Sequence, residues 1–273
     1  MSDQPSQSEE PHLLYERDGH VAIVTMNRPA AKNALSGEML VRMYDAWVDI
    51  DEDPEVYVGI LTGAGGTFCS GMDLKAFAGG TQAQNNPFQK RMEEDGDLHW
   101  KALLRHFRPR KPLIAAVEGF ALAGGTEILQ GTDIRVAGEG AVFGITEVAR
   151  GLFPLGGSTV RLRRQIPYTL AAEMLLTARR VPAAEAKEIG LIGHVVPDGT
   201  ALDKARGLAD QIAANAPLSV QAVLKSFREG AEMTEADALA NELEIGWPIF
   251  ATKDAKEGAT AFAEKRPAVF KGE

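Results

Sequence analysis

A pair of glycines with an acidic residue close behind it is the clearest candidate for chemistry in this 273-residue chain. In the stretch Ile114 to Asp133, read as IAAVEGFALAGGTEILQGTD, an apolar strand-like run leads to Gly124 and Gly125, and Glu127 follows within the next turn. The first N–H groups of a helix have no partner inside it and lie at the positive end of its dipole, so they can face a polarised oxygen. The pattern predicts an oxyanion hole with a carboxylate beside it. Taken alone, the stretch is explained equally well by a helix that merely begins with small residues and an acidic side chain.

A second glycine segment and a second acidic residue strengthen the first interpretation. Thr62 to Leu74 reads TGAGGTFCSGMDL and follows another strand-like run, so each glycine segment could donate one backbone N–H to a shared oxygen. Phe143 to Ser158, read as FGITEVARGLFPLGGS, adds Glu147, twenty positions after Glu127. Without its partner, Glu147 could equally be a surface acid in a turn.

These segments resemble the enoyl-CoA hydratase/isomerase (crotonase) family, and the resemblance runs from about His12 to the C-terminus. The motifs that carry it are, in order, NRPAAKNAL, FCSGMDLKAF, AAVEGFALAGGTE, ITEVARGLFPLGG and AKEGATAFAEKR. The resemblance implies an α/β, crotonase-like (ClpP/crotonase) spiral of ββα units with a C-terminal helical oligomerisation region, in trimers that pair into hexamers. Residues 1–11 are then a polar N-terminal tail, residues 12–198 the spiral core, and residues 199–273 the C-terminal helical region.

By this resemblance, the backbone N–H groups of Met72 and Gly124 hold the thioester oxygen of a CoA substrate. Glu127 chiefly activates the water that attacks Cβ, and Glu147 delivers a proton to Cα of the developing enolate. A hydratase needs both carboxylates, whereas single-glutamate isomerases of the family keep only the second. The other substrate and CoA contacts implied by the resemblance are Arg28, Lys32, Ser70, Asp73, Leu74, Lys75, Phe262 and Lys265. Each basic residue among them, taken singly, also fits an ordinary solvated surface charge.

Three functions therefore remain open. The first is an enoyl-CoA hydratase acting on a trans-2-enoyl-CoA, the second a Δ3-Δ2-enoyl-CoA isomerase using Glu147, and the third a low-turnover acyl-CoA binding protein. Retention of both glutamates favours the hydratase. No cofactor is expected, because CoA is part of the substrate. No metal site is expected either, because the five histidines are scattered without metal-ligand spacing.

Composition excludes several other classes of protein. A net charge of −9 and an isoelectric point near 5.2 argue against nucleic acid or an anionic membrane as partner. Cys69 is the only cysteine, which excludes an intramolecular disulfide and indicates a reducing, cytoplasmic compartment, and we expect it to be a small buried hydrophobe. The polar first eleven residues contain no signal peptide, and no stretch is apolar enough to span a membrane. Phosphate-loop, dinucleotide-binding and Gly-x-Ser-x-Gly motifs are absent.

The first half of the chain contains clear element signals. Gly19 to Met26 reads as a strand, and Ser36 is a candidate N-cap. The helix behind Ser36 is expected to end at Asp53-Pro54, and the residues of its apolar face are Leu40, Met43, Trp47 and Ile50. Gly79 to Gly96 has no clear period and predicts a loop near the site, whereas His99 to Phe107 predicts a helix.

The second half is mostly helical by composition. The expected helices before residue 200 are Ser158 to Ile166, Leu170 to Thr177 and Pro182 to Gly190, and only helices are expected after it. Gln130-Gly131 stands where relatives usually carry an apolar or small pair, which predicts looser packing behind Glu127. Pro248 predicts a kink or break at Ile245 to Trp247, because proline removes a helical hydrogen bond.

Overall fold

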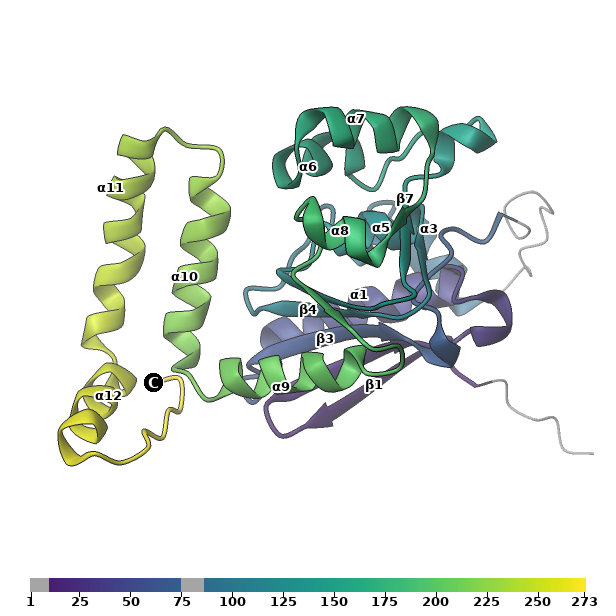
Figure 1. Cartoon of the computed structure of the whole chain (residues 1–273). Helices are drawn as coiled ribbons and strands as arrows, with labels where there is room; N and C mark the ends of the chain where they lie inside the picture. The colour runs from purple at the N-terminus through teal and green to yellow at the C-terminus, as the bar shows by residue number, and fades with distance from the viewer. Residues whose placement is uncertain (1–9, 75–85) are drawn as a thin grey trace, which may run out of the picture.

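Two β-sheets and the helices around them form the body of the molecule, from which a helical arm extends (Figure 1). The structure is a computed structural model, and it describes residues 10–74 and 86–273. The larger sheet contains, in spatial order, β1 (Leu13–Asp18), β2 (Val21–Met26), β3 (Val58–Gly63), β4 (Leu113–Val117), β6 (Ile134–Gly138) and β9 (His194–Val196). Its first pair is antiparallel and its later pairs are parallel. The smaller sheet contains β5 (Phe120–Leu122), β7 (Val142–Gly144) and β8 (Val181–Pro182).

Helices surround both sheets. Those before Gly124 are η1 (Pro29–Ala31), α1 (Gly37–Glu52), η2 (Ala64–Gly66), α3 (Pro87–Glu94) and α4 (Leu98–Ala102). Those that follow are α5 (Gly124–Leu129), η3 (Glu147–Arg150), α6 (Ser158–Gln165), α7 (Tyr168–Thr177), α8 (Ala183–Glu188) and α9 (Ala201–Ala213). The predicted α/β class is confirmed.

The larger sheet is buried on both faces because its strands alternate between two apolar layers. In β2, Ala22 and Val24 belong to the main core cluster, whereas Val21 and Ile23 belong to a second cluster on the opposite face. Helix α1 covers the first face. The four residues predicted to form its apolar face are all buried: Leu40, Met43, Trp47 and Ile50. Helix α9 covers the second face with small residues: Ala201, Ala205 and Ala209.

Helix α1 begins and ends where the sequence predicts. The Ser36 hydroxyl oxygen accepts a hydrogen bond from Met39 N at 3.2 Å and so satisfies one of the helix's free N–H groups. The helix ends at Glu52, and Asp53 takes an extended conformation before Pro54.

The chain leaves the larger sheet for the smaller one at Gly119. This residue has a φ of +56°, and a β-carbon there would lie 2.5 Å from the carbonyl oxygen of Gly66. Only glycine allows both the turn and this close approach. The step carries the chain from β4 to β5, from which α5 begins two residues later.

Two predicted elements differ in the structure. The expected loop of Gly79 to Gly96, of which residues 79–85 lie outside the described residues, contains helix α3, whose start is capped by the Asn86 side chain accepting from Phe88 N at 2.9 Å. The polar composition hid this short helix, because its capping signal lies before residues with little apolar periodicity. Helix α4 is also shorter than predicted and ends at Ala102, because Leu104 has a left-handed φ of +56° that a helix cannot continue.

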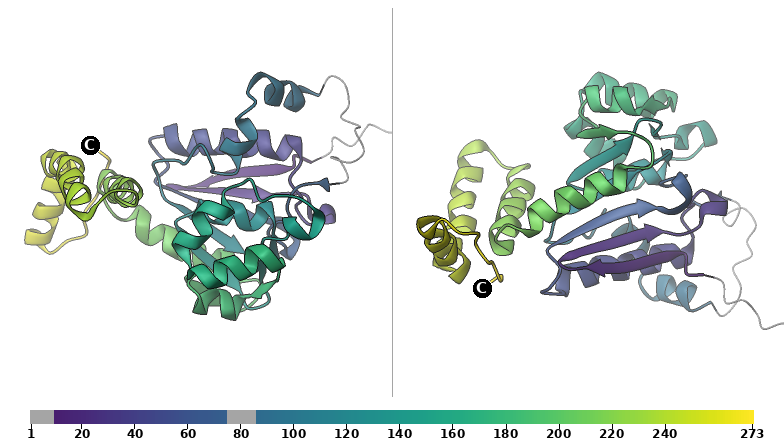
Figure 2. Two further views of the ribbon diagram at one scale, coloured as in Figure 1. Left: turned by 90° about the horizontal axis from the view of Figure 1, so that it is seen from above. Right: turned by 60° about the horizontal axis from the view of Figure 1, so that its bottom comes forward.

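A C-terminal arm stands apart from the body in all views (Figures 1 and 2). It comprises α10 (Pro217–Gly230), α11 (Glu235–Gly246), η4 (Trp247–Ala251) and α12 (Lys253–Glu264). The predicted break at Pro248 is confirmed, since α11 ends at Gly246 and tighter 3₁₀ turns follow. The division at residue 199 stays a proposal, and the packing of α9 on the sheet groups that helix with the body.

One ion cluster ties the arm to the body. Arg228 of α10 lies 3.1 Å from both carboxylate oxygens of Asp133, and Arg108 lies 3.2 Å from one of them. Asp133 also accepts a hydrogen bond from the backbone N of Leu113 in β4 at 2.9 Å. All three charged side chains are largely shielded from solvent, so their hydrogen bonds are mutually dependent.

Replacing Asp133 by alanine is expected to lower the free energy of unfolding by about 3 kcal/mol, because two shielded guanidinium groups lose their shared partner. Urea unfolding followed by circular dichroism measures this. The matched control is Glu232→Ala, which removes the partner of Arg164 in a solvent-exposed pair and should cost less than about 1 kcal/mol. Equal losses in the two variants would contradict a special role for Asp133.

Candidate active site

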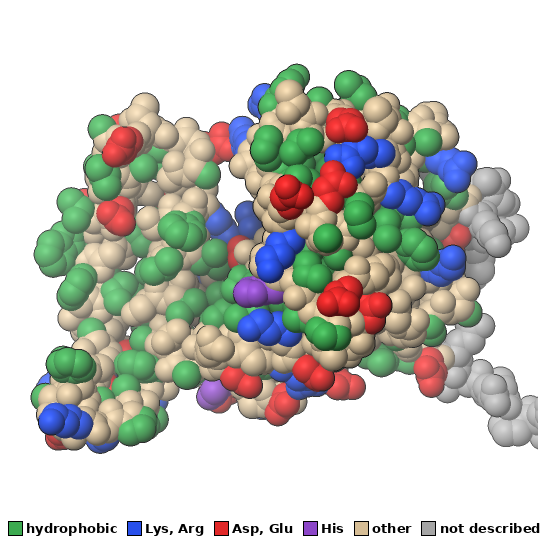
Figure 3. Space-filling model, viewed as in Figure 1, with side chains coloured by type: hydrophobic (Ala, Val, Ile, Leu, Met, Phe, Trp, Pro, Cys, Tyr) green, Lys and Arg blue, Asp and Glu red, His purple; other side chains and the backbone are tan. Residues whose placement is uncertain are grey.

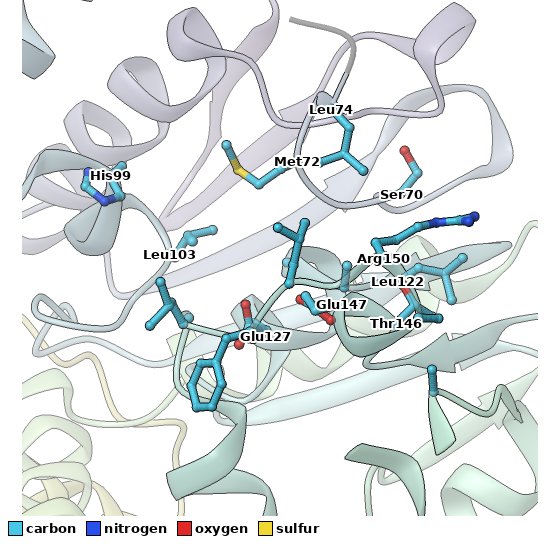
Figure 4. Close-up of a pocket in the computed structure, with 18 of the residues that line it drawn as sticks. Ser70, Met72, Leu74, His99, Leu103, Leu122, Glu127, Thr146, Glu147 and Arg150 are labelled. Carbon is cyan, nitrogen blue, oxygen red and sulfur yellow. The ribbon is translucent and has the colours of Figure 1, made fainter. Parts of the chain in front are cut away.

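A pocket of about 660 Å³ opens where the start of α5 meets the segment after Cys69 (Figure 4). Both predicted glutamates line it, together with the predicted oxyanion residues Met72 and Gly124. Much of the remaining wall is apolar and comes from α4 and the segment after η3: Trp100, Leu103, Leu152, Phe153 and Leu155. The pocket therefore combines an apolar cavity with a few convergent polar groups, as ligand sites commonly do.

The two predicted N–H donors lie on segments in direct contact. A β-carbon on Gly71 would be 2.8 Å from the Ala123 β-carbon and 3.5 Å from the backbone N of Gly124. Leu35 N donates to Gly71 O at 2.9 Å, and Asp73 N donates to Leu35 O at 3.2 Å. Because these pairings use the groups on either side of Met72 along one edge, the Met72 N–H points to the other edge. Gly124 is the first residue of α5, where a helical N–H has no partner within the helix.

Helix α5 is held close to the Cys69 segment. A β-carbon on Gly125 would lie 2.6 Å from Cys69 O, so any larger residue would push the two segments apart. The Thr126 hydroxyl donates to Ala121 O and accepts from Gly144 N at 3.1 Å, which fixes the helix to β5 and β7. Cys69 is fully buried, and burial raises the pKa of its thiol to about 12, so it is the small buried side chain that was expected.

Glu127 is a buried carboxyl group with hydrogen-bond donors around it. Its side chain is only 4% exposed, and its Oε1 accepts from Ser158 N at 3.3 Å. Burial raises its pKa, while hydrogen bonds from Ser158 and Gly156 oppose that rise by favouring the ionised form. A β-carbon on Gly156 would lie 2.6 Å from Glu127 Oε2, so the glycine makes room for the carboxylate.

Glu147 enters the same pocket from the first residue of η3. Figure 4 shows its carboxyl group beside that of Glu127. Its Oε2 is buried and has no hydrogen-bond partner among residues 10–74 and 86–273. Burial, followed by the charge of Glu127, raises the pKa of Glu147 to about 7. Near neutral pH the pair can thus hold one proton donor and one proton acceptor, which is the requirement for paired acid–base chemistry.

Several of the predicted substrate and CoA contacts lie close to one another. Arg28 donates to Ala34 O at 2.7 Å and lies 3.1 Å from Asp73, while Ser70 N donates to Lys32 O at 3.0 Å. The Lys32 ammonium lies 5.3 Å from the ring centroid of Phe120. Ser70 and Leu74 line the pocket itself. Lys75 lies outside the described residues.

The structure does not bring the C-terminal residues to this pocket within one chain. Phe262 and Lys265 lie at the end of α12, and neither lines the pocket. Phe262 is 87% exposed. The structure therefore does not place these two predicted CoA contacts beside the predicted catalytic residues.

Two basic residues and an aromatic wall were missed by sequence reasoning. Arg150 and Arg180 line the pocket. The Arg180 guanidinium lies 5.8 Å from the ring centroid of Phe120, and the Lys32 ammonium lies over the same ring. His99, Trp100 and Phe153 also line the pocket, from elements far apart in the chain. The basic pair Arg179-Arg180 after helix α7 is the one sequence signal that could have pointed to the first group.

Residues 16–273 match the model of the Enoyl-CoA hydratase/isomerase family, so the match covers the whole described site. The chain belongs to this family. It is 60% identical over 257 residues to "Enoyl-CoA hydratase EchA19" of Mycobacterium tuberculosis, covering 94% of this chain and 95% of that protein. It is also 38% identical to "(E)-benzylidenesuccinyl-CoA hydratase" of Thauera aromatica, covering 95% and 99% of the two chains.

Solved structures of the same family have the same fold. A putative enoyl-CoA hydratase/isomerase of Mycobacterium abscessus superposes with a TM-score of 0.86 at 48% identity, covering 96% of this chain and all of that one. An enoyl-CoA hydratase of Mycobacterium tuberculosis superposes with a TM-score of 0.87 at 42% identity, covering 97% of this chain and all of that one. The predicted crotonase-like fold is therefore confirmed.

The raised pKa of Glu147 has a consequence for stability. A folded chain in which a carboxyl pKa rises from 4.5 to about 7 prefers the protonated form. The resulting stability is fully present below pH 4.5 and is lost as the pH rises through about 7.

Glu147→Gln cannot ionise, so it should melt higher than the wild type above pH 7, by about 2–4 °C for each kcal/mol of penalty removed. The difference should shrink as the pH falls toward 4.5. Calorimetry at several pH values measures it. Glu139→Gln, which removes a carboxylate from the exposed turn after β6, is the control. A melting difference independent of pH would contradict the electrostatic cause.

Proposed function

We propose that the pocket adds water across the 2,3 double bond of a trans-2-enoyl-CoA to give a 3-hydroxyacyl-CoA. The chain is an enoyl-CoA hydratase, a hydro-lyase, of fatty-acid or related acyl-CoA catabolism. One observation carries the proposal: two carboxyl groups with different proton affinities share one pocket with the start of α5. The relatives named as hydratases support it.

The first step is polarisation of the thioester. Its oxygen accepts hydrogen bonds from the N–H groups of Met72 and Gly124, so negative charge can develop on it when the double bond is attacked. The positive end of α5 lies at the same position and favours that charge. The apolar walls exclude bulk water and strengthen both effects.

The second step is the transfer of water. Glu127, whose carboxylate form is favoured by hydrogen bonds from Ser158 and Gly156, takes a proton from the water as its oxygen bonds to Cβ. Glu147, protonated up to about pH 7, gives its proton to Cα as the enolate collapses. Water is thereby added completely, and the proton on Glu127 returns to Glu147 before the next turnover. CoA is part of the substrate, and these steps require no further cofactor.

We also propose that the chain assembles into homotrimers that pair into hexamers, and that it is cytoplasmic. The support for assembly is the apolar surface of the arm, visible in Figure 3, where large side chains are more than half exposed: Val223, Phe227, Leu239, Leu243, Trp247 and Phe250. Burying such a surface against another copy is favourable. Within residues 10–74 and 86–273, no helix combines the length and apolar character that a bilayer crossing requires.

Glu127→Gln and Glu147→Gln should each keep the fold and the affinity for CoA while losing about 10²–10⁴-fold in hydration, as expected for acid–base groups. A panel of 2-enoyl-CoA and 3-enoyl-CoA thioesters, followed by the conjugated absorbance, measures the loss or gain of conjugation. If Glu127→Gln hydrates normally and only Glu147 is needed to conjugate a 3-enoyl-CoA, the function is isomerisation. If the wild type turns over no thioester of the panel, the chain is a binding protein.

Lys265→Glu should weaken binding of free CoA by about tenfold without changing oligomer size, because it reverses one charge near a phosphate. Deletion of residues 234–273 should lower both the affinity for CoA and the oligomer size. Light scattering and calorimetric titration measure the two properties. Lys204→Glu, an exposed charge reversal on α9, is the matched control. A truncated chain of unchanged size and CoA affinity would leave the arm without either role.

A further inference from the structure

A buried amide lies directly behind the predicted catalytic helix. Gln130, at the end of α5, is 1% exposed, and Ser158, the first residue of α6, is fully buried. The Gln130 Nε2 lies 2.7 Å from Ser158 Oγ and 3.4 Å from the carbonyl oxygen of Thr126. The expectation of loose packing at Gln130-Gly131 was wrong, because Gln130 fills this space and a β-carbon on Gly131 would lie 2.5 Å from Leu104 Cβ.

The contacts of Gln130 give the hydrogen bonds a direction. A backbone carbonyl only accepts, so the end of the amide near Thr126 O is the N–H₂ group. That group therefore donates to Ser158 Oγ, and the hydrogen of the serine hydroxyl is directed elsewhere. Ser158 approaches the Glu127 carboxylate with both its backbone N–H and its hydroxyl. A line of donors thus runs from Gln130 through Ser158 to Glu127.

We propose that Gln130 and Ser158 are positioning residues that orient the Glu127 carboxylate and hold it in the ionised form in which it accepts a proton from water. The inference rests on the role of Glu127 in the proposed function. Hydrogen bonds to an ionised acceptor are stronger than those to a neutral one, so both donors of Ser158 favour the charged form. Gln130 acts through Ser158 and touches no reacting atom.

Other charged groups also face Glu127, and they bear on how its ionisation is tested. Glu147 reaches it from η3, Arg161 from α6, and Arg105 from the segment after α4. His99 of α4 lines the same pocket. The variants of Gln130 and Ser158 keep all of these charged residues, so their pH profiles are compared with the same charged groups present.

A buried amide with an unpaired oxygen destabilises the fold if the side chain serves only to fill space. Gln130 Oε1 is buried and accepts no hydrogen bond within residues 10–74 and 86–273. An unpaired buried polar atom is destabilising, whereas replacing both partners of a buried hydrogen bond by apolar groups of the same shape is often neutral or stabilising. Positions that break this rule are often functional, which agrees with a role in catalysis.

The test is the pH dependence of hydration kcat/KM in Gln130→Leu and Ser158→Ala. The rate falls at low pH as Glu127 takes up a proton, so loss of a donor should move this acid limb to higher pH and lower kcat by about tenfold. Gln130→Leu removes the unpaired Oε1 together with the donor to Ser158 Oγ, so its melting temperature should change little. The matched control Thr132→Val removes another buried hydroxyl at the end of α5, bonded to Leu129 O at 2.7 Å, and should leave the acid limb in place.

The double variant tests whether Gln130 acts on Glu127 through Ser158. If Gln130 acts through Ser158, adding Gln130→Leu to Ser158→Ala should move the acid limb no further. An acid limb that stays in place in both single variants, or a loss of melting temperature with an unchanged profile, overturns the inference. If Glu127→Gln is inactive while these profiles are unchanged, only the positioning role fails. If Glu127→Gln hydrates normally, the proposed role of Glu127 itself has failed.

Discussion

The close approach of two backbone segments, at the start of α5 and after Cys69, is the constraint on which the rest of the site depends. A β-carbon on Gly125 would meet Cys69 O at 2.6 Å, and one on Gly71 would meet Ala123 at 2.8 Å. These glycines let the two segments of the chain touch, and the contact brings together the segments that carry Met72 and Gly124, both of which line the pocket. The parallel order of β3, β4 and β6 brings the segments together, because the ends of neighbouring parallel strands meet at one edge of the sheet.

The second determinant is that two carboxyl groups share one poorly solvated pocket. Burial raises the pKa of both, and the charge of Glu127 adds to the rise at Glu147. Glu127 has donors on α6 and the preceding loop, whereas the Glu147 Oε2 has no partner in the described part of the chain. Burial acts on both groups in the same direction, so the donors around Glu127 and their absence at Glu147 Oε2 among the described residues separate the pair into a proton acceptor and a proton donor.

The sequence predicted those parts of the molecule whose signals are local. Ser36 caps α1 as expected, Pro248 ends α11, and the glycine pattern led to the pocket that contains Glu127 and Glu147. Features that depend on distant partners were missed or misread. The sequence predicted loose packing at Gln130, because its hydrogen-bond partner Ser158 is 28 residues away. Arg180 reaches the pocket from a distant part of the sequence, and Phe262 is exposed on the arm.

The most direct test of this account is a crystal structure of the wild-type protein with a saturated acyl-CoA, which binds but has no double bond to hydrate. In this complex the thioester oxygen should lie about 2.7–3.1 Å from the backbone nitrogens of both Met72 and Gly124. Cα and Cβ of the acyl chain should lie against Glu147 and Glu127, respectively. A thioester oxygen bound away from these two nitrogens, or an acyl chain that does not reach the two glutamates, would contradict it.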